Sequence, residues 1–332
     1  MDGRQLALFS EAVAAPTLRD IANAVRDAGL AGLPNARQRA DQARYQEVQV
    51  RSALSEAKGM PFKWTLNPYR GCTHACEYCY ARKYQRHLEL GAGDEFSSVI
   101  LVKTNLVERL RTELARPGWT RETVAIGTAT DPYQPIEGHY RLTRRSLEVI
   151  AAARTPASIV TKGPMVVRDI DVLTDVARAA ECHVFVSVPT VDEEAWARLE
   201  PGTAAPLQRL RAVRQLSDAG INAGVLMMPL VPGITTSRPL VERTLKAMAD
   251  AGARFVGTCV ARLDPGVREY FFEFIEREYP SLIDGYSRLY TGARVKADYA
   301  REVDTMVQSL VTQTGAETAR RVRRRGDGPS RP

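Results

Sequence analysis

The stretch Asn67-Pro-Tyr-Arg-Gly-Cys72-Thr-His-Ala-Cys76-Glu-Tyr-Cys79-Tyr80 places three cysteines in one short loop. An apolar run typical of a strand, residues 62–66, comes before it, and residues 80–90 after it have a helical pattern. Three thiolates in one strand-to-helix loop can bind three irons of a cubane iron–sulfur cluster. The fourth iron then keeps an open position for a cofactor or substrate, as a catalytic zinc does.

A structural zinc site is the main alternative for these cysteines. Such a site takes four ligands, usually in two pairs, yet Cys182 and Cys259 stand alone far along the chain. His74 or His87 could complete a set of three cysteines and one histidine, but neither gives a usual zinc spacing. The residues alone favour the open-iron cluster and leave the zinc alternative open.

The C-x3-C-x2-C motif, with Tyr78 directly before its last cysteine, resembles the signature of radical S-adenosylmethionine (SAM) enzymes. The resemblance implies a [4Fe-4S] cluster whose open iron binds the amino and carboxylate groups of SAM. Reduction then splits SAM into methionine and a 5′-deoxyadenosyl radical, which abstracts hydrogen from a substrate that the motif does not identify. Together with the later Thr130-Asp131-Pro-Tyr-Gln-Pro-Ile-Glu137, the motif is similar to a bacterial branch related to spore photoproduct lyase, over roughly residues 45–310.

Length and composition predict one large domain with extensions. The 332 residues are 44% hydrophobic, which is ample for a buried core. No apolar run approaches a membrane span and the N-terminus lacks the apolar region of a signal peptide, so no membrane association is expected. An iron–sulfur cluster needs reduced thiols, and five cysteines with three clustered do not make a disulfide framework, so we expect a cytoplasmic protein and a monomer.

The formal net charge of +7 lies mainly at the C-terminal end. Residues 319–332 hold six arginines against Asp327, a net of +5, which leaves +2 for the rest of the chain. We expect residues 314–332 to be a basic disordered tail that could contact nucleic acid. Residues 1–60 are expected to form an N-terminal extension with a helix at 17–30 and a linker at 32–42, and residues 61–313 to form the core.

From residue 62 onward, apolar β-rich runs alternate with helical patterns, which is typical of a parallel α/β sheet. The expected strands are residues 62–66, 123–129, 157–161, 183–188, 221–228 and 254–260. The expected helices are residues 105–116, 143–153, 169–180, 206–219 and 239–251, with closing helices at 264–278 and 296–312. The family resemblance sharpens this to a partial (β/α)6 TIM-like barrel, whose active site lies at the C-terminal ends of the strands.

The resemblance also suggests residues that bind SAM. Thr130 and Asp131, after the second strand, take the place of the loop that binds the methionine amino group, although an Asp-Pro turn can simply end a strand. Tyr78 would lie against the adenine. Candidates for the carboxylate, the ribose or the adenine also follow later strands: Lys162, Ser187, Arg198 and Leu230. Arg198 is the weaker candidate, because it could instead pair with Glu200 or another neighbouring acid.

Two residues are candidates for radical chemistry. Tyr80 matches a tyrosine of spore photoproduct lyase that could relay a hydrogen atom, and its alternative role is a packed aromatic side chain. Cys259 ends the sixth strand and could donate hydrogen, although most such cysteines are buried apolar residues. A departure from spore photoproduct lyase is Thr128, which stands where that enzyme has its hydrogen-donating cysteine.

Three functions therefore remain. The favoured one is a radical SAM enzyme that takes its electron from a donor such as flavodoxin or ferredoxin. The second is DNA-lesion repair of the spore photoproduct lyase type, against which Thr128 counts. The third is a non-catalytic iron–sulfur or zinc protein whose basic tail binds nucleic acid.

Overall fold

The computed structural model describes residues 42–57, 59–88, 95–314 and 317–318. The expected helix at 17–30, nearly all of the linker at 32–42 and the arginine-rich residues 319–332 lie outside the described residues. Within the described part of the chain, every helix is too short or too polar to span a lipid bilayer.

The main sheet has seven parallel strands, with the short strand β2 (Leu54–Glu56) added antiparallel at one edge. Its order is β11-β10-β9-β8-β7-β6-β3-β2. The parallel strands are β3 (Trp64–Leu66), β6 (Val124–Ile126), β7 (Ala157–Thr161), β8 (Cys182–Ser187), β9 (Asn222–Leu230), β10 (Phe255–Val260) and β11 (Glu317–Thr318). All six expected strands are confirmed, with small shifts at their ends, and the sheet is open because β2 and β11 form its two edges.

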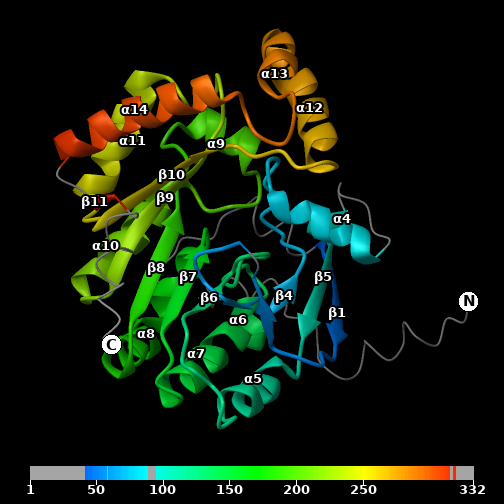
Figure 1. The fold of residues 1–332 in the computed structure, drawn as a ribbon, viewed down its shortest axis with the longest axis vertical. Coiled ribbons are helices and arrows are strands. Elements are labelled where there is room, and N and C mark those ends of the chain that lie inside the picture. Colours follow the sequence, from blue (N-terminus) through cyan, green and yellow to red (C-terminus); the bar gives the residue numbers. More distant parts are fainter. Residues whose placement is uncertain (1–41, 58, 89–94, 315–316, 319–332) are drawn as a thin grey trace, which may run out of the picture.

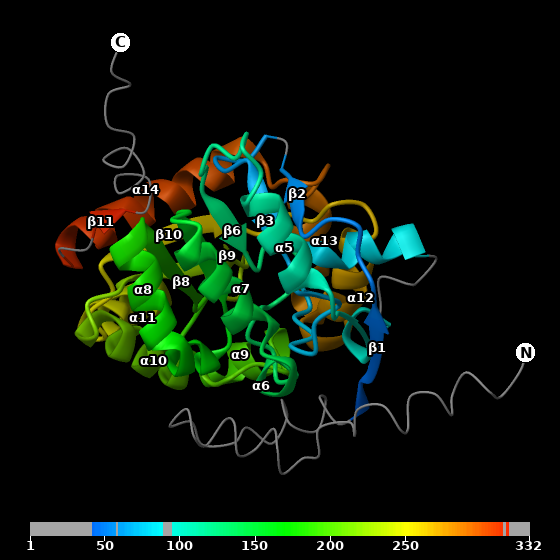
Figure 2. The ribbon, with the colours of Figure 1, turned by 90° about the horizontal axis from the view of Figure 1, so that it is seen from below.

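The helices between these strands cover one side of the sheet, as Figures 1 and 2 show. They are α5 (Leu106–Leu114), α7 (Leu142–Ala152), α8 (Ile170–Ala179), α10 (Pro206–Asp218) and α11 (Arg238–Asp250), all as expected. Side chains alternate along each strand. In β8, Val184 and Val186 are buried in the main core, while Phe185 and Ser187 face the opposite side of the sheet. We call this opposite side the inner face of the sheet.

A second sheet of three strands was not expected. It pairs β1 (Arg44–Val48) in parallel with β5 (Val99–Lys103), and β5 in antiparallel with β4 (Tyr69–Arg70). The sheet matters for the site because β4 leads directly into the cysteine loop. The helix expected at residues 80–90 is confirmed as η1 (Tyr80–Leu88), which is a 3-10 helix.

The closing helices are confirmed as α12 (Val267–Glu278) and α14 (Ala297–Thr314), with η3 (Pro280–Leu282) and α13 (Ile283–Leu289) between them. Figure 1 shows α12 and α13 standing beyond the end of the sheet. Their aromatic side chains form a second core cluster that includes Cys76 and Tyr78. The remaining short elements are α4 (Glu95–Ser98), α6 (Glu137–Tyr140), η2 (Pro164–Asp169) and α9 (Glu193–Leu199).

Candidate active site

The three cysteines of the motif lie in a tight turn, residues 72–79, which we call the cluster loop. Gly71 starts this turn with a φ of +83°, and a Cβ at this position would lie 2.5 Å from the Val99 carbonyl oxygen. Only glycine fits there without displacing β5. The amide of Cys72 donates to the Phe96 carbonyl at 3.0 Å, and the amide of Cys79 donates to the Cys76 carbonyl at 3.2 Å. The loop is thus held by its own backbone and by the neighbouring elements.

The donor set of the cluster loop fits an iron–sulfur cluster. Burial raises the pKa of the Cys76 thiol; Lys162 opposes this, whereas Glu200 and the other two cysteines add to it. Thiolates packed this closely need cations among them. Within the residues described, no three His, Cys, Asp or Glu side chains converge on a single-ion position. In a cubane cluster each thiolate binds a different iron, so three thiols in one loop suit such a cluster.

Thr130 and Gln134 support the loop from the C-terminal end of β6. The Thr130 hydroxyl donates to the Gly71 carbonyl at 2.6 Å. The Gln134 amide donates to the same carbonyl at 3.3 Å, and its oxygen accepts from the Thr73 amide at 3.2 Å. Thr130 therefore uses its proton to position the cluster loop, and Gln134, which the sequence did not single out, completes the support.

Asp131 is buried and its carboxylate is surrounded by protein donors. Thr161 donates its hydroxyl to this carboxylate at 2.6 Å and Lys162 donates its amide at 2.6 Å, while the Nδ1 of His74 lies 3.3 Å away. Burial alone would raise the pKa of Asp131, but His74 and these hydrogen bonds lower it to about 2. Asp131 thus ties the end of β7 to the cluster loop.

A buried charged group lies beside Cys76, and we call it the Glu200 network. The Tyr78 hydroxyl donates to one oxygen of Glu200, and Arg209 pairs with the other. The ammonium of Lys162 lies 3.7 Å from Glu200 and 5.7 Å from the centre of the Tyr78 ring. Burial would lower the pKa of Lys162, but Cys76 and Glu200 raise it. Lys162 thus stays charged next to the cluster loop.

Sequence reasoning missed Glu200 and Arg209 as site residues. Glu200 stands 122 residues after Tyr78, between α9 and α10, and Arg209 is on α10. The feature that indicates a role for them is the burial of their ion pair, because neither side chain is more than 3% exposed. Arg209 also donates to the Ser187 carbonyl at 2.7 Å and so connects the network to the end of β8.

The segment of residues 199–202 lies directly on the cluster loop. The amide of Glu77 donates to the Leu199 carbonyl at 3.0 Å, and the amide of Gly202 donates to the His74 carbonyl at 3.1 Å. A Cβ at Gly202 would lie 2.3 Å from the Thr73 carbonyl oxygen. The approach of two backbones requires glycine at this position.

The other expected SAM-binding residues are less closely associated with the loop. Ser187 is buried at the end of β8, where its hydroxyl donates to the Met228 carbonyl at 3.2 Å. Leu230 is 1% exposed and belongs to the main core. Arg198 pairs with Glu194 at 2.7 Å and lies over the Tyr279 ring. The structure therefore does not bring Arg198 or Leu230 to the Glu200 network.

Tyr80 and Cys259 both lie at accessible positions. The Tyr80 ring is 45% exposed, and its hydroxyl donates to the Thr128 carbonyl at the end of β6. Cys259 is exposed near the end of β10 and its thiol contacts the Val260 carbonyl at 3.0 Å. By strand alternation it shares the inner face of the sheet with Phe255, whose ring packs on Phe185 at 4.9 Å.

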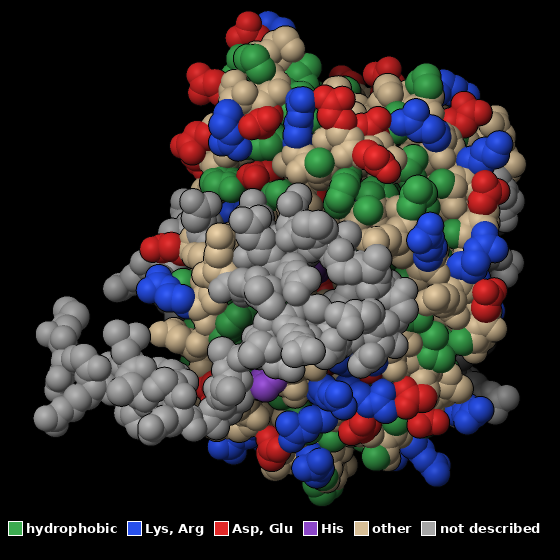
Figure 3. All heavy atoms as spheres, turned by 180° about the vertical axis from the view of Figure 1, so that it is seen from behind, with side chains coloured by type: hydrophobic (Ala, Val, Ile, Leu, Met, Phe, Trp, Pro, Cys, Tyr) green, Lys and Arg blue, Asp and Glu red, His purple; other side chains and the backbone are tan. Residues whose placement is uncertain are grey.

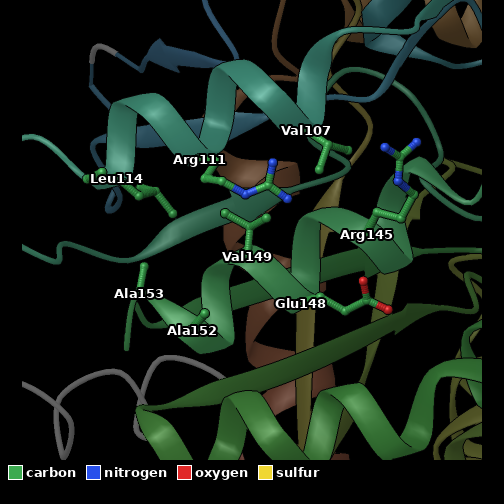
Figure 4. Close-up of a pocket in the computed structure, with 9 residues that line it drawn as sticks. Val107, Arg111, Leu114, Arg145, Glu148, Val149, Ala152 and Ala153 are labelled. Carbon is green, nitrogen blue, oxygen red and sulfur yellow. The ribbon is translucent and has the colours of Figure 1, made fainter.

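A separate surface pocket of about 470 Å³ lies between α5 and α7 (Figure 4). Its lining includes Val107, Arg111, Arg145 and Glu148, and no residue of the cluster loop contributes to it. This pocket is on the helical side of the sheet and takes no part in the site.

Comparison with known proteins shows the family to which the chain belongs. The model of the Radical SAM superfamily matches residues 66–242, which include the cluster loop and the Glu200 network. The chain belongs to the radical SAM superfamily. A relative in Mycobacterium tuberculosis, Uncharacterized protein Rv2578c, is 38% identical over 81% of this chain and 80% of its own.

Two further proteins are similar to this chain. A spore photoproduct lyase variant, solved with bound AdoMet and dinucleoside spore photoproduct, superposes with a TM-score of 0.63 at 16% identity. The match covers 91% of this chain and 94% of that one, and it shows a shared fold. The Radical SAM Nalpha-GlyT isomerase of Pseudomonas phage M6 is 28% identical over 53% of this chain and 35% of its own.

Proposed function

We propose that this protein cleaves SAM reductively and uses the resulting 5′-deoxyadenosyl radical to remove a hydrogen atom from a substrate. Cys72, Cys76 and Cys79 would hold a [4Fe-4S] cluster, which supplies the electron and an open iron for SAM. The observation that carries the proposal is one loop of three thiols inside the matched family region, with Cys72 and Cys76 buried and Cys79 partly buried, supported on both sides by the fold.

The chain's own residues suit the binding of a zwitterionic nucleoside. Lys162 offers an ammonium for the carboxylate of SAM. Glu200 lies beside this ammonium, and Asp131 accepts from the backbone amide of Lys162. Tyr78 offers a ring fixed by its hydroxyl bond to Glu200, and Ser187 a hydroxyl at the end of β8. Thr130 and Asp131 act on the cluster loop, so we propose that they position it rather than contact SAM through their side chains.

Tyr80 and Cys259 are the proposed radical-handling residues. Both are accessible, and both belong to elements that border the inner face of the sheet. A thiol or phenol can return a hydrogen atom to a substrate radical, whereas the hydroxyl of Thr128 is a poor donor.

Anaerobic reconstitution tests the proposal. We expect iron and sulfide to bind, and dithionite to start formation of 5′-deoxyadenosine from SAM. Replacing Cys72, Cys76 or Cys79 by alanine should abolish both, while Cys182→Ala, which changes a buried cysteine of the main core, should keep both. Stoichiometric zinc binding without any affinity for SAM would overturn the proposal.

Repair of a DNA lesion is a second candidate, favoured by the overall fold similarity to spore photoproduct lyase. Thr128 counts against a closely similar reaction. On the described part of the face in Figure 3, acidic and basic side chains are interspersed. The net positive charge that non-specific binding of nucleic acid needs is concentrated in residues 319–332.

The setting of the reaction follows from its chemistry. Reductive cleavage of SAM consumes an electron, so we propose a low-potential donor such as flavodoxin or ferredoxin. An oxygen-sensitive cluster with reduced cysteines suits the cytoplasm, and we propose that the protein acts there as a monomer.

A further inference from the structure

Arg70 and Lys103 form a pair of neighbouring cations beside the cluster loop. Arg70 ends β4 and is paired with Leu101 of β5, and Lys103 follows on the same face of that strand. Burial first, and then the charge of Arg70, lower the pKa of Lys103 to about 8. The two charges are thus close together and partly removed from water.

Neither cation has an acidic partner among the described residues. The Lys103 ammonium donates to the Asn67 carbonyl at 2.7 Å, and the Arg70 guanidinium donates to the Tyr84 carbonyl. The Nε of Arg70 is buried and has no hydrogen-bond partner in the described part of the chain. Several other largely buried cations do have a carboxylate partner: Lys83, Arg144, Lys162, Arg168 and Arg209.

A short series of contacts links the pair to Tyr80, a proposed radical-handling residue. Asn67, which accepts from Lys103, also joins β3 to the end of β6: its side chain bonds the Thr128 hydroxyl at 3.3 Å and the Ala129 amide at 2.8 Å. The Tyr80 hydroxyl contacts the carbonyl of the same Thr128. Tyr84, whose backbone carbonyl accepts from Arg70, is 38% exposed, and Tyr80 is 45% exposed, so Arg70 lies at an accessible part of η1.

We propose that Arg70 and Lys103 bind a phosphate group carried by the substrate. Two partly desolvated positive charges with no carboxylate partner among the described residues would be stabilised by an anion from outside the chain. A phosphate group offers several oxygens, which can accept from a guanidinium and an ammonium together. The inference rests on the proposed function, because it places the phosphate on the molecule that the radical attacks. The phosphate can be a monoester or a diester within a strand.

Binding of defined anions to the full-length protein, reconstituted without oxygen, tests the subsite. Inorganic phosphate, adenosine 5′-monophosphate and a short oligonucleotide without terminal phosphates are titrated by calorimetry at low salt. We expect saturable binding that weakens at least about tenfold in Lys103→Gln and in Arg70→Gln. It should persist in Lys103→Arg and in Lys63→Gln, which changes an exposed lysine of an ion pair with Glu122. Tighter binding of adenosine 5′-monophosphate indicates a phosphate monoester in the substrate. Tighter binding of the oligonucleotide indicates a phosphate diester.

Equal weakening in Lys103→Gln and Lys63→Gln would overturn the subsite, and so would the absence of saturable binding of all three probes. Should Arg70→Gln fail to fold, the comparison of Lys103→Gln with Lys103→Arg decides. If the wild-type protein binds phosphate as expected but cannot cleave SAM, the proposed function is contradicted and the phosphate subsite is supported. Cleavage of SAM without phosphate binding would contradict the subsite alone.

Discussion

Two arginines, Arg198 and Arg209, differ in their burial and in the burial of their acidic partners. Arg209 is fully buried and pairs with buried Glu200, whereas Arg198 is partly exposed and pairs with exposed Glu194. Removing one partner of a buried pair leaves an uncompensated charge, so Arg209→Gln should lower the free energy of unfolding by about 3–5 kcal/mol. Arg198→Gln should lower it by less than about 1 kcal/mol. Urea unfolding without oxygen compares them, and equal losses would mean that the Glu200 network is not a stabilising pair.

The lowered pKa of Lys103 predicts that the stability of the protein depends on pH. Its pKa in the folded chain is about 8, below its usual 10.5, so the unfolded chain binds the proton more tightly. The resulting loss of stability is fully present below pH 8 and disappears as the pH rises to about 10.5. Lys103→Met should therefore stabilise the protein by about 1–3 kcal/mol at pH 7 and by little at pH 10.5. The midpoints of urea unfolding of wild type and Lys103→Met at pH 7 and pH 10.5 check this. The same difference in stability at both pH values would contradict a buried charge on Lys103.

At this scale, the sequence alone predicts local features best. The cysteine loop was recognisable because its ligands are contiguous in the chain. Glu200 and Arg209 were not, since only the folded chain brings them to Tyr78 and Lys162. The SAM-binding role of Thr130 and Asp131 stays a prediction. The structure shows their polar atoms bonded to protein groups, which no spacing rule reveals.

The segment of residues 199–202 shows how one connection holds the cluster loop. Gly202 allows its backbone to touch the carbonyl of Thr73, and a methyl group there would be placed 2.3 Å from that oxygen. Gly202→Ala should therefore displace the loop and reduce the iron bound after reconstitution by at least about half, because cluster ligands tolerate little displacement. Gly118→Ala, with no atom within 4 Å of the new methyl, should bind iron as wild type does. Full iron content in Gly202→Ala would show that the loop does not need this contact.

Elements with a strong pattern were predictable from the sequence, and elements without one were not. The parallel strands are recognisable by apolar runs between helices, since both faces of such a sheet are covered. Length alone does not decide this, because β3 and β6 have three residues each and were predicted. β2 and β4 have no apolar run of their own, although β4 leads directly into the cluster loop. The sequence predicted a helix at η1 but not its 3-10 geometry, because its apolar spacing is the same as that of an α-helix.

Across the whole molecule, charge is distributed unevenly along the chain. Residues 319–332 carry +5 of the net +7, while acidic and basic side chains alternate on the described face in Figure 3. Deleting residues 319–332 should weaken binding to duplex DNA and flatten its salt dependence, with the slope of log K against log salt reduced by up to about 4. Cleavage of SAM should remain, because the cluster loop and the Glu200 network lie elsewhere.

Filter binding over a range of salt concentrations, beside an assay for 5′-deoxyadenosine, measures both properties of this truncation. The matched control scrambles residues 319–332, which preserves charge and should preserve binding, since counterion release depends on charge rather than order. Unchanged DNA affinity in the deletion would place the nucleic-acid surface on the folded core and strengthen the lesion-repair candidate. Loss of SAM cleavage in the deletion would instead show that this basic segment contributes to the active site.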